Sequence, residues 1–382
     1  MKSEKIMFTV TMFMMLSFFF LHPVSAQEIG GASVNANIKF FLYDQTDGDS
    51  KYFLRDANTG VTTRESQTET TQGSMGVNRS VIYINKQLSD KLSANLDTEL
   101  IASASATPKI GDPIERATSG SVDVDYFQAS FTYKLPNDYE VVAGQVVPPF
   151  TWDYGHKYFW HENYHAWYAT STAMTAAWRD TGMELHKDYG TDMFALPFMV
   201  GLYNGTSQAA TDNNDNKTVL VNMQPDFFQG RLKFNTSYAF GKWDNNDEEN
   251  FNKYVVGIDI DLEKLRFRSE YIVSQFDNKY LSQDRITRDI ENDAWYAKIF
   301  WRFYPGWHVM FGYDILDKDY SGYFSPTYSA SEKYKTSHIS FKYSLSETTS
   351  ILFDNDWTDG ERDDNWSELD IHRMTLGVVI TL

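Results

Sequence analysis

A two-residue alternation of apolar and polar side chains runs through most of this chain and constrains its fold more than any other feature. Between residues 32 and 382, segments of about ten alternating residues are separated in turn by a tight polar turn and by a longer polar loop. Seven turns and eight loops join sixteen strands, and an even number leaves both chain ends on the short-turn side. The longer loops are expected near residues 45–73, 103–121, 148–178, 204–217, 242–252, 277–293, 317–333 and 359–366.

The first residues have the layout of an export signal. Lys2 and Lys5 precede an apolar stretch over residues 6–21, and Pro23 and Ala26 fall where a breaker and a small-residue cleavage site are expected. An uncleaved membrane anchor is the alternative, but the apolar stretch is short for a spanning helix. The sequence therefore predicts a cleaved signal peptide over residues 1–26 and one mature β-barrel over residues 27–382, which enters a membrane as strands.

Individual segments indicate which face of each strand would meet lipid. Trp295, Ile299 and Trp301 share one face of their segment, and Tyr296 and Lys298 share the other. Lipid offers the backbone no hydrogen bonds, so spanning strands must close into a barrel in which each N–H and C=O is paired. We therefore expect an all-β fold, a 16-stranded antiparallel transmembrane barrel with short periplasmic turns and long extracellular loops. A secreted soluble β-sandwich is the alternative, since its strands alternate too.

The composition excludes several classes of function. The chain has no Cys, which rules out disulfides and thiolate metal sites, and its formal net charge of −18 disfavours a nucleic-acid partner. Much of the negative charge falls in the longer loops, for example over residues 244–249. Such runs are usually solvated loop tips. The functional alternatives are bridging by divalent cations to anionic lipopolysaccharide of an outer membrane, and enrichment of cations at a channel mouth.

The polar faces of the predicted strands carry charges of both signs. In a narrow water-filled barrel such charges orient water and hydrated solutes, or they pair with one another along the wall, and both interpretations stay open. Most of the basic positions fall in the C-terminal half of the chain. The acidic candidates for the lumen are Asp97, Glu99, Glu184, Asp259, Asp261, Glu270, Asp314, Asp354 and Asp356. The basic candidates are Lys39, Arg231, Lys233, Arg266, Arg268, Lys298, Arg302, Lys342 and Arg373.

The loop over residues 148–178 is the most unusual segment. Nine of the nineteen residues between 150 and 168 are Phe, Tyr or Trp, and three histidines are interleaved with them. A rim loop this aromatic would aggregate in water, so we expect it to fold inward against the wall and to narrow the pore. A stacking surface for sugars is one alternative, and a metal site through the histidines is another, although their spacing matches no usual ligand pattern. The expected constriction residues are Trp152, Asp153, Tyr154, His156, Lys157, Trp160, His161, Glu162 and His165. We expect the protein to use no metal and no cofactor.

Three short motifs give the chain a resemblance to a known family. They are Gly144-Gln145 running into Pro149-Phe150, Arg179-Asp180-Thr181-Gly182, and Asn204-Gly205. With these motifs, sixteen strands and a long loop after the fifth strand, the chain resembles the general porins of Gram-negative bacteria, and most closely the phosphate-selective porin family. The resemblance implies a homotrimer in the bacterial outer membrane, in which the loop over residues 148–178 folds into the lumen and forms the constriction.

These patterns favour a passive channel over an enzyme. The expected function is that of an outer-membrane porin, a water-filled channel for small hydrophilic solutes and ions. The eight histidines are scattered, and no Ser/His/Asp constellation can be picked from them. The long loop offers Lys157 and Arg179 beside Asp153 and Glu162, so we expect weak selectivity rather than specific uptake of phosphate. Two alternatives stay open: a channel specific for a phosphate, another anion or a sugar, and a barrel scaffold that sheathes a periplasmic electron-transfer partner.

Overall fold

The computed structural model describes residues 27–29, 31–55, 62–103, 121–152, 180–191, 193–205, 216–242, 250–280, 287–319, 331–362 and 368–381. Nearly all of these residues lie in antiparallel β-strands of one sheet, so the predicted all-β antiparallel fold is confirmed. Within this part of the chain, no helix is both long enough and apolar enough to cross a membrane. The predicted signal peptide over residues 1–26 lies outside the described residues.

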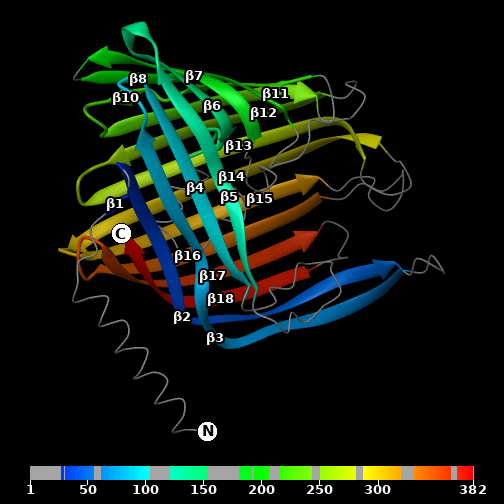
Figure 1. Ribbon diagram of the computed structural model, residues 1–382. Coiled ribbons are helices and arrows are strands. Elements are labelled where there is room, and N and C mark those ends of the chain that lie inside the picture. Colours follow the sequence, from blue (N-terminus) through cyan, green and yellow to red (C-terminus); the bar gives the residue numbers. More distant parts are fainter. Residues whose placement is uncertain are drawn as a thin grey trace.

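The strands follow one another along the chain as antiparallel hairpins (Figure 1). A short 3₁₀ turn, η1 (Pro136–Asp138), joins β5 to β6. The strands are β1 (Gln27–Ile29), β2 (Ala32–Arg55), β3 (Thr62–Gln87), β4 (Leu92–Ser103), β5 (Ser121–Lys134), β6 (Tyr139–Val146), β7 (Asp180–Thr191), β8 (Phe194–Tyr203), β9 (Thr218–Met223), β10 (Asp226–Phe227), β11 (Leu232–Lys242), β12 (Asn250–Asp261), β13 (Leu265–Tyr280), β14 (Thr287–Tyr304), β15 (Trp307–Asp319), β16 (Ser331–Ser344), β17 (Thr349–Arg362) and β18 (Glu368–Thr381).

The pairings between the strands form a ring. β2 to β9 pair in sequence order, β9 pairs with β11, β11 to β18 pair in order, and β18 pairs with β2. Each of these sixteen strands therefore has a partner on both sides within the described residues, and β4 and β5 cross in front of β13 to β15 in Figure 1. The remaining two strands are short additions: β1 pairs with β2, and β10 pairs with β8 and β11. These two segments account for the difference between sixteen predicted strands and eighteen observed ones in the described chain.

The hairpin of β2 and β3 is longer than the sequence pattern indicates. The pattern predicts a loop over residues 45–73, but the two strands stay paired from Asp47 opposite Thr70 to Arg55 opposite Thr62. Both stretches are mainly polar, so the apolar alternation is weak there, whereas the threonines of β3 favour extended backbone. The same error recurs near residues 277–293, 317–333 and 359–366, where β13 to β17 continue into the predicted loops.

The side chains of the sheet are arranged inside out relative to those of a soluble protein. Trp295, Ile299 and Trp301 of β14 are 37%, 42% and 48% exposed, whereas Lys298 on the other face of the same strand is 1% exposed. Soluble proteins seldom bury a charged side chain completely and seldom expose a continuous apolar band. The predicted faces of β14 are therefore confirmed. Exposed large apolar residues on other strands include Phe131, Met183, Leu202, Tyr238, Val256, Tyr271, Phe311, Phe341 and Trp357.

Candidate functional site

The paired strands of the ring form a wall, and the inward side chains of β13 to β15 lie in layers across its inner face. Directly opposed residues on neighbouring strands lie side by side, and every second residue points to the same face. Successive register pairs join Glu270, Tyr296 and Asp314 in one layer. The next layer toward the short turns pairs Arg268 with Lys298. A layer with two carboxylates therefore lies directly beside a layer with two bases, and all four charged side chains are buried.

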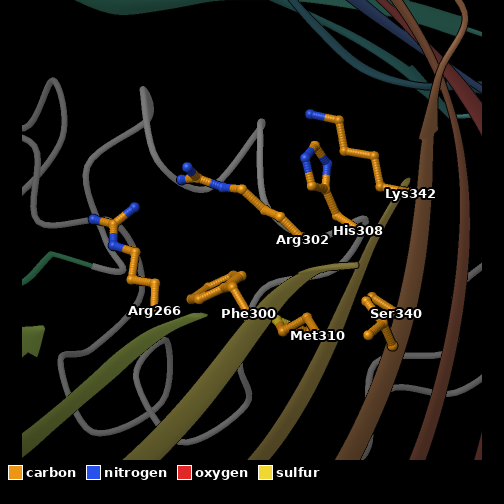
Figure 2. Close-up of a pocket in the computed structure, with 8 residues that line it drawn as sticks. Arg266, Phe300, Arg302, His308, Met310, Ser340 and Lys342 are labelled. Carbon is orange, nitrogen blue, oxygen red and sulfur yellow. The ribbon is translucent and has the colours of Figure 1, made fainter. Parts of the chain in front are cut away.

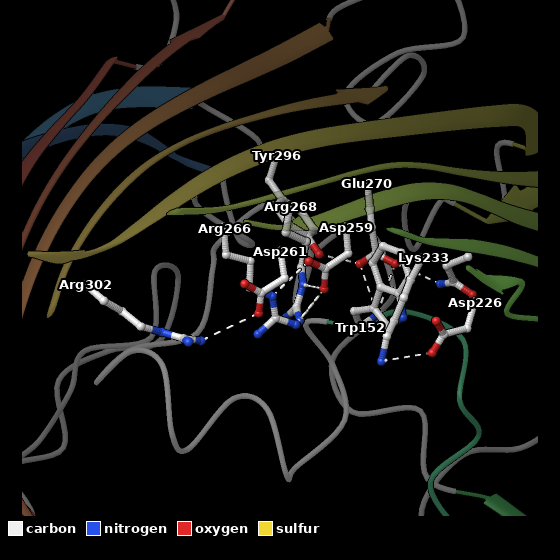
Figure 3. Close-up of polar contacts among 11 residues, drawn as sticks. Trp152, Asp226, Lys233, Asp259, Asp261, Arg266, Arg268, Glu270, Tyr296 and Arg302 are labelled. Carbon is white, nitrogen blue, oxygen red and sulfur yellow. Dashed lines mark hydrogen bonds and ion pairs between the residues drawn. The ribbon is translucent and has the colours of Figure 1, made fainter. Parts of the chain in front are cut away.

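Asp259 of β12 holds two guanidinium groups against the wall. Arg266 donates from Nε to Oδ1 of Asp259 at 2.8 Å and from Nη2 to Oδ2 at 2.6 Å. Arg268 donates from Nε and Nη2 to Oδ2 at 3.0 and 2.9 Å (Figure 3). The side chains of Arg268 and Asp259 are 1% and 4% exposed, so this ion pair is withdrawn from solvent. One carboxylate therefore binds two cations, Arg268, whose side chain is 1% exposed, and Arg266, whose side chain is 22% exposed.

The chain turns into the ring directly after β6. Phe150, Thr151 and Trp152 are 2%, 5% and 5% exposed, although they lie outside any strand. Asn235 Nδ2 and Ser237 Oγ of β11 donate to the carbonyl oxygen of Phe150 at 3.1 and 2.8 Å. This segment, residues 150–152, is thus bonded to the inner face of β11, which lies more than 80 positions later in the sequence.

Glu270 of β13 forms the second attachment of this segment. The backbone N–H of Trp152 donates to both carboxylate oxygens of Glu270, at 3.0 Å each. Asn235 Nδ2 donates to the same carboxylate at 2.8 Å, and the Tyr296 hydroxyl donates to its Oε2 atom. Three donors from three parts of the chain therefore converge on one carboxylate that is 1% exposed.

The ring of Trp152 packs against the inner face at a position where β12 carries a glycine. Gly257 of β12 faces the ring, and a Cβ atom at this position would stand 3.0 Å from Cζ3 of Trp152 and 2.7 Å from Cγ of Glu270. The Arg268 guanidinium lies 5.6 Å from the ring centroid, within the range of a cation–π contact. The absence of a side chain at Gly257 is therefore what allows Trp152 to approach the wall this closely.

Phe150 packs into an apolar layer farther from the short turns. It shares a buried cluster with inward residues of β6, β8, β9 and β11 to β16. The members are Val146, Phe150, Met199, Tyr203, Leu220, Ala239, Val255, Ile272, Ala294, Leu316 and Tyr334. Apolar burial and the polar contacts of Trp152 therefore hold the same short segment from two sides.

Other predicted lumen charges occupy separate positions on the inner face. Glu184 of β7 accepts a hydrogen bond from the Tyr203 hydroxyl at 2.8 Å and contacts His186 at 2.7 Å. Asp314 lies 3.4 Å from His338, whose other ring nitrogen is 2.6 Å from Asp356. Asp354 accepts a hydrogen bond from Ser340, and Asp97 of β4 is 7% exposed.

Several basic candidates lie near the short turns. Arg231 pairs with Glu263 at 3.2 Å, with both side chains mostly exposed, and Lys233 lies 3.4 Å from Asp226. Arg302 and Lys342 line a cavity of about 230 Å³ together with Arg266 and His308 (Figure 2). For Lys39, Glu99 and Arg373 the structure describes the backbone, in β2, β4 and β18.

Of the predicted constriction residues, Trp152 lies within the described part of the chain, attached to the wall as above. The others, Asp153, Tyr154, His156, Lys157, Trp160, His161, Glu162 and His165, lie outside the described residues. Among the residues that are described, no group of three or more His, Asp and Glu side chains is arranged to hold a metal ion.

Of the residues that fasten the inward segment, the sequence pattern singled out Glu270 as a lumen charge but not Asn235, Ser237 or Tyr296. Asn235, Ser237 and Tyr296 lie on the polar faces that the alternation predicts, so their inward direction was available from the sequence. The groups that these side chains bind could not be predicted from the sequence, because Asn235 and Phe150 are 85 positions apart. Gly257 carried a weaker signal, as a glycine within a strand often marks a close approach.

The fold and this interior together define a class of protein. An antiparallel sheet whose pairings return to their start, apolar outside and charged inside, is the architecture of outer-membrane β-barrel proteins. No protein-family model matches this chain, and no curated protein matches its sequence.

Solved structures of bacterial porins resemble the chain in fold. The outer membrane channel DcaP of Acinetobacter baumannii superposes with a TM-score of 0.61 at 14% identity, covering 94% of this chain and all of that one. Salmonella typhi OmpF, in complex with daunomycin, gives 0.55 at 13% identity over 92% and 98% of the two chains. An anion-selective porin from Comamonas acidovorans gives 0.51 at 11% identity over 92% and 100%. The predicted resemblance to Gram-negative porins is confirmed for the fold, which agrees with the predicted outer-membrane localisation.

Proposed function

We propose that this chain is an outer-membrane porin, which forms a passive water-filled channel for small hydrophilic solutes and ions. The observation that carries the proposal is the inside-out distribution of side chains around a ring of paired strands. Val256, Ile299 and Trp301 are 53%, 42% and 48% exposed on the outside. Charged side chains occupy the inner face, where Arg268 and Glu270 are packed against the strands and Lys233 and Arg302 are 41% and 49% exposed. An apolar exterior suits lipid, and a charged interior suits water and ions.

The proposal includes a constriction made by the loop over residues 148–178. Its support is the attachment of residues 150–152 to the inner face of β11 and β13, which directs the start of the loop into the ring. The sixteen strands of the ring would form the transmembrane barrel, with the short turns in the periplasm and the long loops outside the cell. Residues 1–26 would be removed on export, and the mature chain would assemble as a homotrimer in contact with lipopolysaccharide.

Recording in planar lipid bilayers tests the channel directly. Purified, folded protein should open discrete pores whose current is roughly proportional to voltage. A variant that lacks residues 153–168 should conduct severalfold more current per pore, because the deletion removes the proposed constriction.

Two results would count against this proposal. Electrically silent bilayers, with protein that retains strand structure by circular dichroism, would exclude the channel. Equal conductance of the deletion variant and the intact chain would leave the channel in place but exclude the loop as its constriction.

The outer face provides a second test. Val256 lies near the middle of β12 and is 53% exposed, so Val256→Arg should destabilise the protein in lipid vesicles by about 2–4 kcal/mol. The control is Leu262→Arg in the turn after β12, where the side chain is 63% exposed and would lie outside the hydrocarbon. Urea unfolding in vesicles measures both variants. Equal losses for the two would show that Val256 does not face lipid.

A further inference from the structure

His338 of β16 lies on the inner face between two carboxylates of the neighbouring strands. Its Nδ1 atom is 2.6 Å from Oδ1 of Asp356 on β17, and its Nε2 atom is 3.4 Å from Oδ1 of Asp314 on β15. The side chains of His338, Asp314 and Asp356 are 6%, 1% and 13% exposed. One imidazole therefore connects three adjacent strands inside the ring.

Hydrogen-bond chemistry makes this arrangement sensitive to a single proton. A neutral imidazole donates through one ring nitrogen and accepts through the other, whereas an ionised carboxylate only accepts. The neutral form of His338 can therefore donate to Asp314 or to Asp356, but only the imidazolium can donate to both. Histidine is also the side chain that ordinarily changes its charge between about pH 5 and 8.

Two basic residues occupy the flanking strands of the same layer. Lys298 of β14 stands opposite Gly312 of β15, and Gly312 stands opposite His338. Gly312 has no side chain, so Lys298 is the next inward side chain in that direction. In the other direction, Arg373 of β18 stands opposite Asp356.

The inward neighbours of His338 on its own strand, Thr336 and Ser340, are uncharged. Ser340 donates a hydrogen bond to Asp354 of β17, which adds a third carboxylate to this part of the inner face. The charged residues around His338 on the described strands are therefore Asp314, Asp354, Asp356, Lys298 and Arg373. A proton on His338 raises the total charge of this set by one, whatever further contacts the other groups make.

A charge on the wall of a narrow pore acts on ions that it does not touch. Walls of low dielectric constant focus the electric field into the water of the pore, and the sign of the wall charge sets the preference for cations or anions. When His338 loses its proton, the inner face becomes more negative by one unit of charge. Cations should then pass more readily relative to anions.

We propose that the protonation of His338 sets the ion selectivity of the channel. With the imidazolium between Asp314 and Asp356 the pore prefers cations less, and with the neutral imidazole it prefers them more. The proposal rests on the proposed channel, to which it adds a dependence on pH and a residue that determines selectivity.

Reversal potentials of single pores in a gradient of potassium chloride test this role. They should be measured from about pH 5.5 to 9.5, a range in which ordinary carboxylates stay ionised and ordinary lysines stay protonated. The permeability ratio of K⁺ to Cl⁻ should rise about two- to fourfold with pH in the unaltered protein.

Two variants at this position should fix the selectivity at opposite ends. H338Q cannot gain a proton, so its permeability ratio should already be high at low pH and should lose at least about half of the rise. H338K keeps a positive charge throughout the range, so its ratio should stay low at high pH. The two variants remove the same ring but change the charge in opposite directions, which separates the effect of charge from that of a disturbed wall.

H372Q is the matched control on the outer face. The ring of His372 on β18 stacks on that of Trp357, which is 40% exposed, and its Nε2 atom is 2.6 Å from Oδ1 of Asn355. This variant removes a histidine that faces away from the pore, so the rise of the permeability ratio with pH should be unchanged.

Nitrogen NMR of histidine-labelled protein in detergent follows the same proton without any current. The signal that is missing from H338Q should titrate over the pH range in which the selectivity changes. A signal that does not titrate there, or open pores whose selectivity responds to pH equally in H338Q, H338K and the unaltered protein, overturns the role of His338 and leaves the channel intact. An equal loss of the pH response in H372Q also overturns it. Silent bilayers with folded protein overturn the channel and this role together.

Discussion

Asp259→Ala should lower the free energy of unfolding by about 3–5 kcal/mol. The carboxylate of Asp259 accepts hydrogen bonds from both Arg266 and Arg268, and the Arg268 side chain is 1% exposed. Removing the carboxylate takes this counter-charge from a buried guanidinium that water does not reach. The resulting loss of stability is larger than the net contribution of the intact ion pair. Urea unfolding of the protein in lipid vesicles measures the loss.

Glu263→Ala is the control for this experiment, because it also removes a carboxylate that pairs with an arginine. The Arg231 and Glu263 side chains are 67% and 80% exposed, so this variant should lose only about 0–1 kcal/mol. Similar small losses for both variants would mean that water reaches Asp259 and that the interior is wetter than its burial indicates.

Glu270→Ala should detach residues 150–152 from the wall. The variant removes the acceptor of the Trp152 N–H and of two further donors, and each hydrogen bond to a charged group contributes about 1.5–3 kcal/mol. The chain contains no Cys, so T151C introduces a unique thiol at a position that is 5% exposed. Labelling of this thiol by a maleimide should be at least about tenfold faster in the Glu270→Ala background.

Glu291→Ala provides the comparison for the labelling experiment. Glu291 lies on β14 and accepts a hydrogen bond from Gln275, but it makes no described contact with residues 150–152. Its removal should leave the labelling rate of T151C unchanged. A rate that is equally slow in the Glu270→Ala background would show that apolar packing around Phe150 holds the segment without the carboxylate.

The sequence predicts well those features that repeat along the chain. Alternation assigns Trp295 and Trp301 to the outside and Lys298 to the inside of β14, because each strand must divide its side chains between two environments. The same pattern does not predict the pairing of residues 47–55 with residues 62–70 in the β2–β3 hairpin. Polar residues occupy both faces there, so the sequence shows no alternation of apolar and polar residues. The period is therefore informative only where the two faces meet different surroundings.

The sequence does not predict which inward residues share a layer. Trp152 and Glu270 are 118 positions apart, and their meeting depends on the register of every hairpin between them. A shift of one pairing by two residues would keep all faces unchanged but would move Glu270 past Trp152. The inward attachment of the loop was predicted from its aromatic content, but the carboxylate, the amide and the glycine that fix it become apparent only once the strands are in register.

The pairing of β18 with β2 has a consequence for biogenesis. The first and last long strands among the described residues are immediate neighbours, so the ring of paired strands stays open along one side until residues 368–381 reach residues 37–51. A polypeptide interrupted before residue 368 would carry two unsatisfied edges, which in an apolar medium cost several kcal/mol for each unpaired backbone group. Closure of the ring therefore waits for residues 368–381, and insertion into the membrane cannot be completed before these residues have been synthesised.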